Sequence, residues 1–327
     1  MNFLTDKRIL VTGGAGFIGS ALCHDLIGRG NEVICLDNFS TGKKENIMEL
    51  KANPRFRLIN GDIREPEVCV KAVKGVDVVL HQAALGSVPR SILDPATTNA
   101  VNVTGFLNMI IAARDQGIRR FVYASSSSVY GDSQELPKIE NKTGKVLSPY
   151  AVTKVVNEEY ARIFGSTYGM ETIGLRYFNV FGRRQDPEGP YAAVIPLFTM
   201  RFMKHLPPVI NGDGSNSRDF TYIDNVILAN HLAATTENPA ALNEVYNIAC
   251  GDSVTLREMT LLLRGLLAEH DQAISKIEAE HGPGRPGDIP HSVASLGKAV
   301  RLLGYNPQVM FAEGLRRAVE WYKSNLA

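Results

Sequence analysis

The sequence predicts an α/β fold, in which a doubly wound parallel sheet is followed by a smaller mixed domain. The first half of the 327-residue chain alternates short apolar runs with segments of helical periodicity. Such alternation is typical of a parallel sheet covered by helices on both faces. After residue 178 the alternation stops, and turn-rich segments separate the remaining helices. We expect one domain over 1–178, to which a segment near 222–249 returns, and a discontinuous second domain over 179–327.

The individual elements follow from local patterns. Short apolar runs bounded by turn residues predict strands, and apolar positions repeating every three to four residues predict helices. We expect strands at 8–12, 32–36, 55–59, 76–81, 119–125, 171–178 and 246–249. We expect helices at 17–29, 65–73, 97–116, 150–168, 256–269 and 312–324. Ser148 and Pro149 mark one helix start, because serine caps a helix and proline fits its first turn.

Composition excludes several classes of protein. The net charge is +1, with 21% charged and 44% hydrophobic residues, so we expect neither a nucleic-acid nor a membrane partner. The start of the chain lacks a signal pattern and no apolar run is long enough to span a bilayer, which favours the cytoplasm. The four cysteines are scattered without metal-binding spacing, so we expect no metal.

Three glycines connect the first expected strand to the first expected helix. Gly13, Gly16 and Gly19 have the spacing G-x-x-G-x-x-G, which lets the backbone approach a pyrophosphate at the helix N-terminus. Asp37 ends the second strand, where a carboxylate accepts from ribose hydroxyls and repels a 2′-phosphate. The pattern therefore predicts an NAD site rather than an NADP site. A tight turn without a ligand is the alternative interpretation.

Residues that follow later strands extend this candidate site. Asp62 can meet the adenine end, although a plain turn acid is a comparable interpretation. Ala83 and Ala84 let the backbone approach a ligand, and Asn99 either binds the cofactor or satisfies a helix end. The predicted cofactor residues are completed by Phe17, Ile18, Asn38 and Ile63.

Tyr150 and Lys154 lie one helical turn apart, at the start of the helix expected over 150–168. Their spacing places them on one helix face. A lysine ammonium there favours the phenolate and lowers the tyrosine pKa, which suits an acid/base. Ser126, in a serine run that ends the fifth strand, can lie beside Tyr150 and relay its proton. An exposed amphipathic helix and a serine-rich turn are the alternatives.

Together these residues resemble the extended short-chain dehydrogenase/reductase family. The resemblance covers essentially the whole chain, including Arg218-Asp219-Phe220 and the segments 125–131, 176–180 and 285–288. Within that family the chain is most similar to bacterial UDP-N-acetylglucosamine 4-epimerases, chiefly through 182–187 and 191–196. The resemblance implies a Rossmann-type NAD-binding domain over 1–178 and a UDP-sugar-binding domain over 179–327.

The resemblance also implies residue roles. Ser126, Tyr150 and Lys154 would be catalytic, with Lys154 also contacting the nicotinamide ribose. The substrate contacts would be Gly86, Ser126, Ser127, Ser128, Tyr150, Asn179, Ala193, Val194, Arg218, Arg285, Asp288 and Ser292. The small residues among them imply room for an N-acetyl group. Ser127 and Ser128 stand where 4,6-dehydratases carry Asp and Glu, and decarboxylases also place a glutamate at the second position, so both activities are disfavoured.

The implied activity is reversible 4-epimerisation of UDP-GlcNAc and UDP-GalNAc through a 4-keto sugar, with NAD retained and with UDP-Glc and UDP-Gal also considered. One alternative is a UDP-glucuronate or UDP-galacturonate 4-epimerase, with Arg90 or Arg184 facing the sugar carboxylate. Another is an NAD-binding regulatory protein without catalysis. The family further implies bacterial polysaccharide biosynthesis and a homodimer, in which the helices expected over 97–116 and 150–168 form a four-helix bundle.

Overall fold

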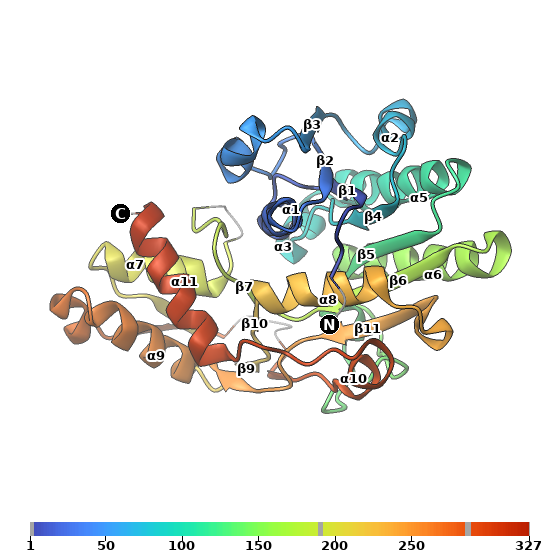
Figure 1. Ribbon diagram of the computed structural model, residues 1–327. Helices are drawn as coiled ribbons and strands as arrows, with labels where there is room; N and C mark the ends of the chain where they lie inside the picture. The colour runs from blue at the N-terminus through green and yellow to red at the C-terminus, as the bar shows by residue number, and fades with distance from the viewer. Residues whose placement is uncertain (1–2, 189–191, 285–288, 327) are drawn as a thin grey trace.

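The computed structural model describes residues 3–188, 192–284 and 289–326. A seven-stranded sheet in the order β11-β6-β5-β4-β1-β2-β3 forms its centre (Figure 1). Every neighbouring pair in this sheet is parallel. The strands are β1 (Arg8–Thr12), β2 (Glu32–Asp37), β3 (Phe56–Asn60), β4 (Val78–His81), β5 (Arg120–Ser126), β6 (Glu171–Tyr177) and β11 (Glu244–Ile248). The predicted Rossmann-type sheet is confirmed.

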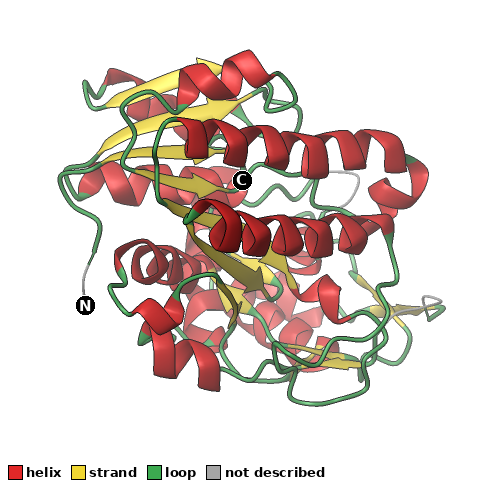
Figure 2. Ribbon diagram, turned by 90° about the vertical axis from the view of Figure 1, so that its right-hand side faces the viewer, coloured by secondary structure: helices red, strands yellow, loops and turns green. Residues whose placement is uncertain are grey.

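Helices cover both faces of the sheet (Figures 1 and 2). One face carries α1 (Phe17–Gly28) and α8 (Ile223–Thr235), and the other carries α2 (Pro66–Ala72), α5 (Phe106–Asp115) and α6 (Pro149–Tyr168). Successive strand residues point to opposite faces. Ile9 and Val11 therefore join one buried cluster, whereas Leu10 joins the other. Because both faces are buried, the strands appear in the sequence as continuous apolar runs.

The helix expected over 97–116 is interrupted by a wider turn. The observed order is α4 (Pro95–Asn99), the π-helical segment η2 (Ala100–Gly105) and α5. Asn102 in this segment is buried; its side chain accepts from the Leu85 amide and donates to the Leu85 carbonyl and the Thr153 hydroxyl. The prediction of one uniform α-helix is wrong here, because Asn102 ties the segment to the loop after β4. Wide π turns are often found at functional sites.

The later part of the chain adds helices and small sheets. Helices α7 (Val194–Met203), α9 (Leu256–Ala268) and α11 (Phe311–Leu326) contact one another, whereas α10 (Gly297–Leu303) contacts β11. The small sheets join β7 (Val180–Phe181) with β10 (Thr221–Tyr222), β8 (Val209–Asn211) with β13 (Glu280–Gly282), and β9 (Ser217–Arg218) with β12 (Val254–Thr255) and β14 (His291–Ser292). Arg218, which the sequence placed in a turn-rich segment, thus lies in a strand that pairs with the strand of Ser292. No helix among the described residues is long and apolar enough to cross a membrane.

Two elements return from the later part of the chain to the central sheet. Helix α8 packs on β5 and β6, and β11 pairs with β6 as the terminal strand. This is the path expected for the segment near 222–249. The remaining helices, α3 (Val88–Leu93) and the short helices η1 (Lys44–Ala52), η3 (Ser127–Tyr130), η4 (Pro239–Ala241) and η5 (Gln272–Lys276), occupy connections.

Candidate active site

A cavity of about 300 Å³ lies where the carboxyl ends of β1 to β4 meet the start of α1. Ligands bind at this edge in open parallel sheets. The predicted residues that line it are Gly13, Gly16, Phe17, Ile18, Gly19, Asp37, Asn38, Asp62, Ile63, Ala83, Ala84 and Gly86. Gly86 was expected to contact the sugar, whereas the other lining residues in this group were expected to contact NAD. The loop after β4 therefore lies between the predicted NAD site and the predicted sugar site.

The glycine loop is packed too closely for larger residues. Gly13 has φ of 65°, and a Cβ there would lie 2.8 Å from Cα of Ala83. A Cβ on Gly19 would lie 2.1 Å from the Gly13 carbonyl oxygen. The N-cap of α1 is Gly16, which offers no side-chain acceptor to the first amides of the helix. Those amides suit a pyrophosphate, so the residues present fit the predicted dinucleotide.

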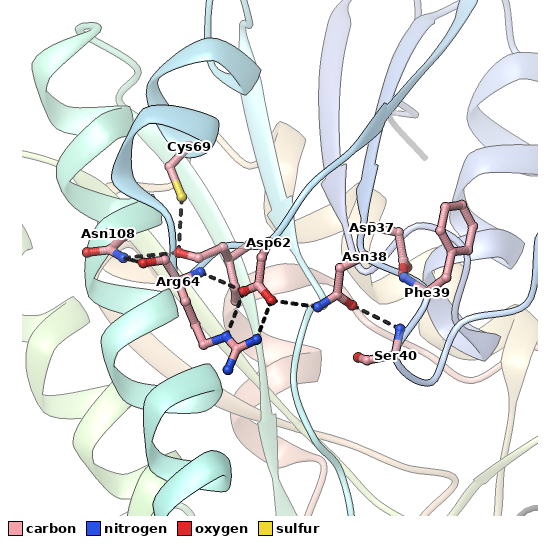
Figure 3. Close-up of polar contacts among 9 residues, drawn as sticks. Asp37, Asn38, Phe39, Ser40, Asp62, Arg64, Cys69 and Asn108 are labelled. Carbon is pink, nitrogen blue, oxygen red and sulfur yellow. Dashed lines mark hydrogen bonds and ion pairs between the residues drawn. The ribbon is translucent and has the colours of Figure 1, made fainter.

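Asp37 is fixed at the end of β2 by backbone amides (Figure 3). One carboxylate oxygen accepts from the Phe39 amide at 2.8 Å, and the other accepts from the Ala15 amide at 2.9 Å. Burial raises the pKa of Asp37, whereas these amides lower it. Each carboxylate oxygen has two lone pairs, so both keep capacity for a ribose hydroxyl.

The Asp62 carboxylate lies between Arg64 and Asn38 (Figure 3). Arg64 donates to both carboxylate oxygens, at 2.7 and 3.0 Å, and the Asn38 amide donates at 2.7 Å. The Arg64 bonds lower the pKa of Asp62 to about 2, so this carboxylate is ionised at neutral pH. Asp62 therefore lines the cavity as a charged group held in one orientation.

The predicted catalytic side chains meet at the end of β5. Helix α6 packs against β5 and η3, and the Lys154 ammonium lies 5.9 Å from the centre of the Tyr150 ring. The ammonium donates to the Ala124 carbonyl at 2.9 Å. The Ser126 hydroxyl lies close enough to Tyr150 to lower its pKa, and it accepts from the Ser128 amide at 3.2 Å. The structure thus brings Ser126 together with Tyr150 and Lys154, from which it lies 24 and 28 positions away in the sequence.

The expected electrostatic effect of Lys154 is not what the structure shows. Burial raises the pKa of Tyr150, and the Ser126 hydroxyl is the group that opposes this rise. Burial also lowers the pKa of Lys154 to about 8, with Glu158 acting in the opposite direction. The prediction of a lowered tyrosine pKa is therefore wrong for this state, because burial disfavours both charged forms and the ammonium is bonded to the Ala124 carbonyl.

Asn102 connects the cavity to the catalytic helix. Its side chain bonds the backbone of Leu85, which lines the cavity, and the hydroxyl of Thr153, which precedes Lys154 on α6. Asn99, which the sequence offered as a cofactor residue, is exposed and does not line the cavity; Val101 does. The wide turn of η2 determines which of these side chains faces inward.

Three predicted substrate residues come together in the later part of the chain. Ser292 pairs in register with Arg218 across β14 and β9. Asn179, with φ of 35°, donates to the carbonyl of the residue after Arg218, Asp219, at 3.0 Å. None of the three lines the 300 Å³ cavity.

The remaining predicted substrate residues that the structure describes lie at the starts of two helices, η3 and α7. Ala193 is the N-cap of α7 and Val194 its first residue. Ser127 and Ser128 form the start of η3, and within the described residues the buried Ser128 hydroxyl has no hydrogen-bond partner. A buried hydroxyl left in this way suits a group that bonds a ligand. Arg285 and Asp288 lie outside the described residues.

Sequence reasoning missed several residues of the cavity. Gln82 lines it directly after β4; its side chain donates to Asn230 at 3.2 Å and accepts from the Tyr177 hydroxyl at 3.1 Å. Ser40 and Thr41 line it in the loop after Asp37. Their position after a strand end was a usable signal, because Gln82 directly precedes the predicted Ala83, and Ser40 and Thr41 lie within three residues of the predicted Asn38. The other missed lining residues are Leu36, Gly61, Leu85 and Val101.

The two arginines considered for a sugar carboxylate lie in different places. Arg90 is in α3, after the loop that lines the cavity. Arg184 lines a second cavity of about 360 Å³ with Trp321, and the described residues that line it include none of those lining the first. Within the described residues, no group of three His, Cys, Asp or Glu side chains is placed to hold a metal ion.

Comparisons with known proteins identify the family of this chain. The family model described as "NAD dependent epimerase/dehydratase family" matches residues 9–249. A putative UDP-glucose 4-epimerase of Methanocaldococcus jannaschii is 38% identical over 97% of this chain and 99% of its own length. The UDP-N-acetylglucosamine 4-epimerase from Methanobrevibacter ruminantium, solved with UDP-N-acetylmuramic acid, is 37% identical with a TM-score of 0.91, covering 98% of this chain and 99% of its own.

A third match is the UDP-glucuronic acid 4-epimerase from Bacillus cereus, solved with UDP-glucuronic acid and NAD. It is 31% identical with a TM-score of 0.85, over 97% of this chain and 99% of its own. These matches span nearly the whole sequence, and the glycine loop, Asp37 and the Tyr150–Lys154 pair are in place in the fold. This chain therefore belongs to the NAD dependent epimerase/dehydratase family, and it is an NAD-dependent isomerase.

Proposed function

We propose that this protein catalyses the reversible 4-epimerisation of UDP-N-acetylhexosamines, interconverting UDP-GlcNAc and UDP-GalNAc. The observation that carries the proposal is the meeting of Ser126, Tyr150 and Lys154 at the end of β5, where Asn102 links α6 to the glycine-lined cavity. Similarity to UDP-sugar 4-epimerases supports the reaction type. UDP-Glc and UDP-Gal form the second substrate pair to be tested.

The roles of the residues follow from their geometry. Tyr150, as phenolate, removes the proton of the sugar 4-hydroxyl while Ser126 holds the 4-oxygen. After the 4-keto sugar has rotated to present its other face, the same groups return the proton. Bound NAD supplies the acceptor and donor of hydride at C4. Gly13, Gly16 and Asp37 would hold the dinucleotide, and Lys154 would contact its nicotinamide ribose.

The acetylated sugar is supported by small side chains. A Cβ added to Gly86 would meet no atom within 4 Å, so the loop after β4 leaves open space at the cavity. Ala193 and Ser292 are also small. An acetamido group needs volume that a bulky side chain would fill. Ser127 and Ser128 offer no carboxylate, which leaves dehydration without its acid and base.

The uronate alternative depends on a cation near the sugar. Arg184 lines the separate cavity beside Trp321, so its position does not favour that role. Arg90 in α3 is the remaining candidate. We therefore rank UDP-glucuronate or UDP-galacturonate epimerisation second. The NAD-binding protein without catalysis, which the sequence left as an alternative, is set aside by the similarity to NAD-dependent epimerases.

The test is to incubate the purified protein with UDP-GlcNAc, without added NAD, and to separate the UDP-sugars by chromatography. UDP-GalNAc should appear, because the cofactor is regenerated in each turnover. UDP-glucose and UDP-glucuronate are assayed in parallel. Turnover of UDP-glucuronate without turnover of UDP-GlcNAc would establish the uronate alternative, and NAD content without turnover of any of the three UDP-sugars would contradict both substrate assignments.

We also propose the assembly and the division of labour between domains. Residues 1–178 would bind NAD, with α8 and β11 completing the sheet, and residues 179–327 would bind the UDP-sugar. A homodimer is supported by exposed apolar side chains on the α3–α6 surface, where α3 and α6 are in contact. These side chains are Ile92, Leu93, Val152 and Ile163.

A further inference from the structure

Asp219 is a buried carboxylate to which the proposed function gives no role. It follows β9 directly and its exposed fraction is 0%. Three backbone amides donate to its carboxylate: Cys250 at 2.9 Å, Gly251 at 3.0 Å and Ala294 at 3.1 Å. Charge-assisted bonds of this kind are roughly twice as strong as neutral ones.

The three donors belong to segments that are far apart in the chain. Cys250 and Gly251 follow β11, the terminal strand of the central sheet, whereas Ala294 follows β14. The backbone carbonyl of Asp219 accepts from the side chain of Asn179, which follows β6. One residue therefore fastens four segments together.

Each segment that meets Asp219 from the substrate side carries a predicted UDP-sugar contact. Arg218 immediately precedes Asp219. Ser292 lies two residues before the donor Ala294 and pairs in register with Arg218. Asn179 is bonded to the Asp219 carbonyl at 3.0 Å. A side chain with no exposed surface cannot touch the substrate, so it acts on these residues through the backbone.

We propose that Asp219 is a positioning residue that holds Asn179, Arg218 and Ser292 in the mutual register that UDP-sugar binding requires. The inference rests on the proposed function, because these three residues are its predicted substrate contacts. Fixing the segments before binding reduces the ordering cost of association. The competing explanation is a purely structural fastening, which would affect folding and NAD binding as much as UDP-sugar binding.

The decisive variant is Asp219→Asn. The amide keeps one acceptor oxygen, but its NH₂ group must face at least one of the three backbone N–H donors, so at least one bond is lost. Loss of such a bond predicts a rise of about tenfold or more in the Kd of the UDP-sugar. NAD content should stay at the wild-type level, and kcat should fall by less than KM rises. The probes are UDP-GlcNAc and UDP-glucose, measured by calorimetry on the NAD-containing enzyme.

Asp252→Asn is the matched control. Asp252 is an exposed carboxylate close enough to raise the pKa of Asp219, and it accepts from the Ser253 amide rather than from the fastened segments. The Asp252→Asn variant removes one negative charge close to Asp219 but leaves all three bonds to the Asp219 carboxylate in place. We expect wild-type affinity for both UDP-sugars in this variant.

A pH series on the unmodified enzyme provides a second measurement, which does not depend on the variant folding. Burial raises the pKa of Asp219 to about 6. As the pH falls through that value the carboxylate gains a proton and loses acceptor capacity, so KM for the UDP-sugar should rise. Asp219→Asn should lack this rise. The titratable groups around Asp219 are Asp252, Cys250 and Tyr305, together with His291 on β14.

His291→Asn completes the design, because the His291 ring contacts the Ser217 hydroxyl at 2.9 Å, two residues before Asp219. The acid rise in KM should persist in this variant. Wild-type affinity in Asp219→Asn, equal loss of NAD and UDP-sugar in that variant, or disappearance of the acid rise in His291→Asn would each overturn the inference. A wild-type enzyme that retains NAD but binds neither UDP-sugar would instead overturn the proposed function, and the inference with it.

Discussion

Tyr150 is the residue on which the proposed chemistry depends most. Tyr150→Phe removes the hydroxyl but keeps the ring on α6, so NAD binding should survive. We expect the epimerisation rate to fall by about 10²- to 10⁴-fold, the usual contribution of a positioned acid/base. The check combines the initial rate with UDP-GlcNAc and the NAD released on denaturation. A rate near that of the wild type would contradict the mechanism.

The buried ammonium of Lys154 should lower the folding stability of the protein. Burial brings its pKa from 10.5 to about 8, so the buried cation costs about 3 kcal/mol at neutral pH. Lys154→Met removes that cost and the bond to the Ala124 carbonyl, worth about 1 kcal/mol. The net expectation is a variant that melts a few degrees higher at pH 7 and has lost its activity.

The pH dependence of this gain has a definite sign. Between about pH 8 and pH 10.5 the unfolded wild-type chain binds more protons at Lys154 than the folded chain does. Wild-type stability therefore rises with pH in that window, and the advantage of Lys154→Met should shrink. Thermal unfolding at pH 7, 8.5 and 10 measures it. A gain that stays constant with pH would show that burial of the charge is not its cause.

The sequence was sufficient to predict the relative placement of Tyr150 and Lys154 but not their electrostatics. The four-residue spacing was enough to place Tyr150 and Lys154 on one helical face. The bond from Lys154 to the Ala124 carbonyl spans 30 positions and exists only once α6 packs on β5. The burial that raises the pKa of Tyr150 is likewise a tertiary property, which no local pattern contains.

At the scale of elements, α6 and β6 are joined by a buried ion pair. Glu158 accepts two bonds from Arg176 at 2.9 and 2.8 Å, with side chains 12% and 5% exposed. Ser125 at the end of β5 also donates to Glu158, and Arg176 donates to the Glu140 carbonyl. The pair therefore fixes the helix that carries Tyr150 against the two strands beside it.

Breaking this pair from one side should be costly. Arg176→Met leaves the Glu158 charge buried without compensation, which costs about 3–5 kcal/mol. The double variant Glu158→Leu, Arg176→Met should be more stable than Arg176→Met alone, because no charge is then left unpaired. Urea unfolding of the wild type and the variants gives the comparison. A double variant less stable than Arg176→Met would contradict this account.

The predicted elements fail where a distant contact changes the backbone. Helical periodicity continues through 97–116, so a uniform helix was the natural expectation. The π turn of η2 arises because Asn102 bonds the backbone of Leu85, 17 positions away. The short strands β9 and β14 escaped prediction because two-residue strands carry no periodicity.

On the scale of the whole molecule, the alternation of strands and helices was sufficient for the sheet but not for the assembly. The apolar side chains Val152 and Ile163 on α6 are 46% and 41% exposed. Val152→Glu should weaken the proposed dimer, because a charge would be buried against the partner. Light scattering over a concentration series measures this. Val300→Glu, at an equally exposed site in α10, is the control and should leave the molecular mass unchanged.

The return of α8 and β11 to the sheet limits how this chain can be truncated or recombined with relatives. A fragment ending at residue 178 would leave β6 as an open edge and would uncover the sheet face on which α8 packs. The boundary that function suggests is therefore not a boundary at which the chain can be cut. Recombination that exchanged one half for that of a relative would have to preserve the packing of α8 and β11. We therefore expect substitutions at the proposed sugar contacts Gly86, Ala193 and Ser292 to change the sugar preference more readily than an exchange of domains would.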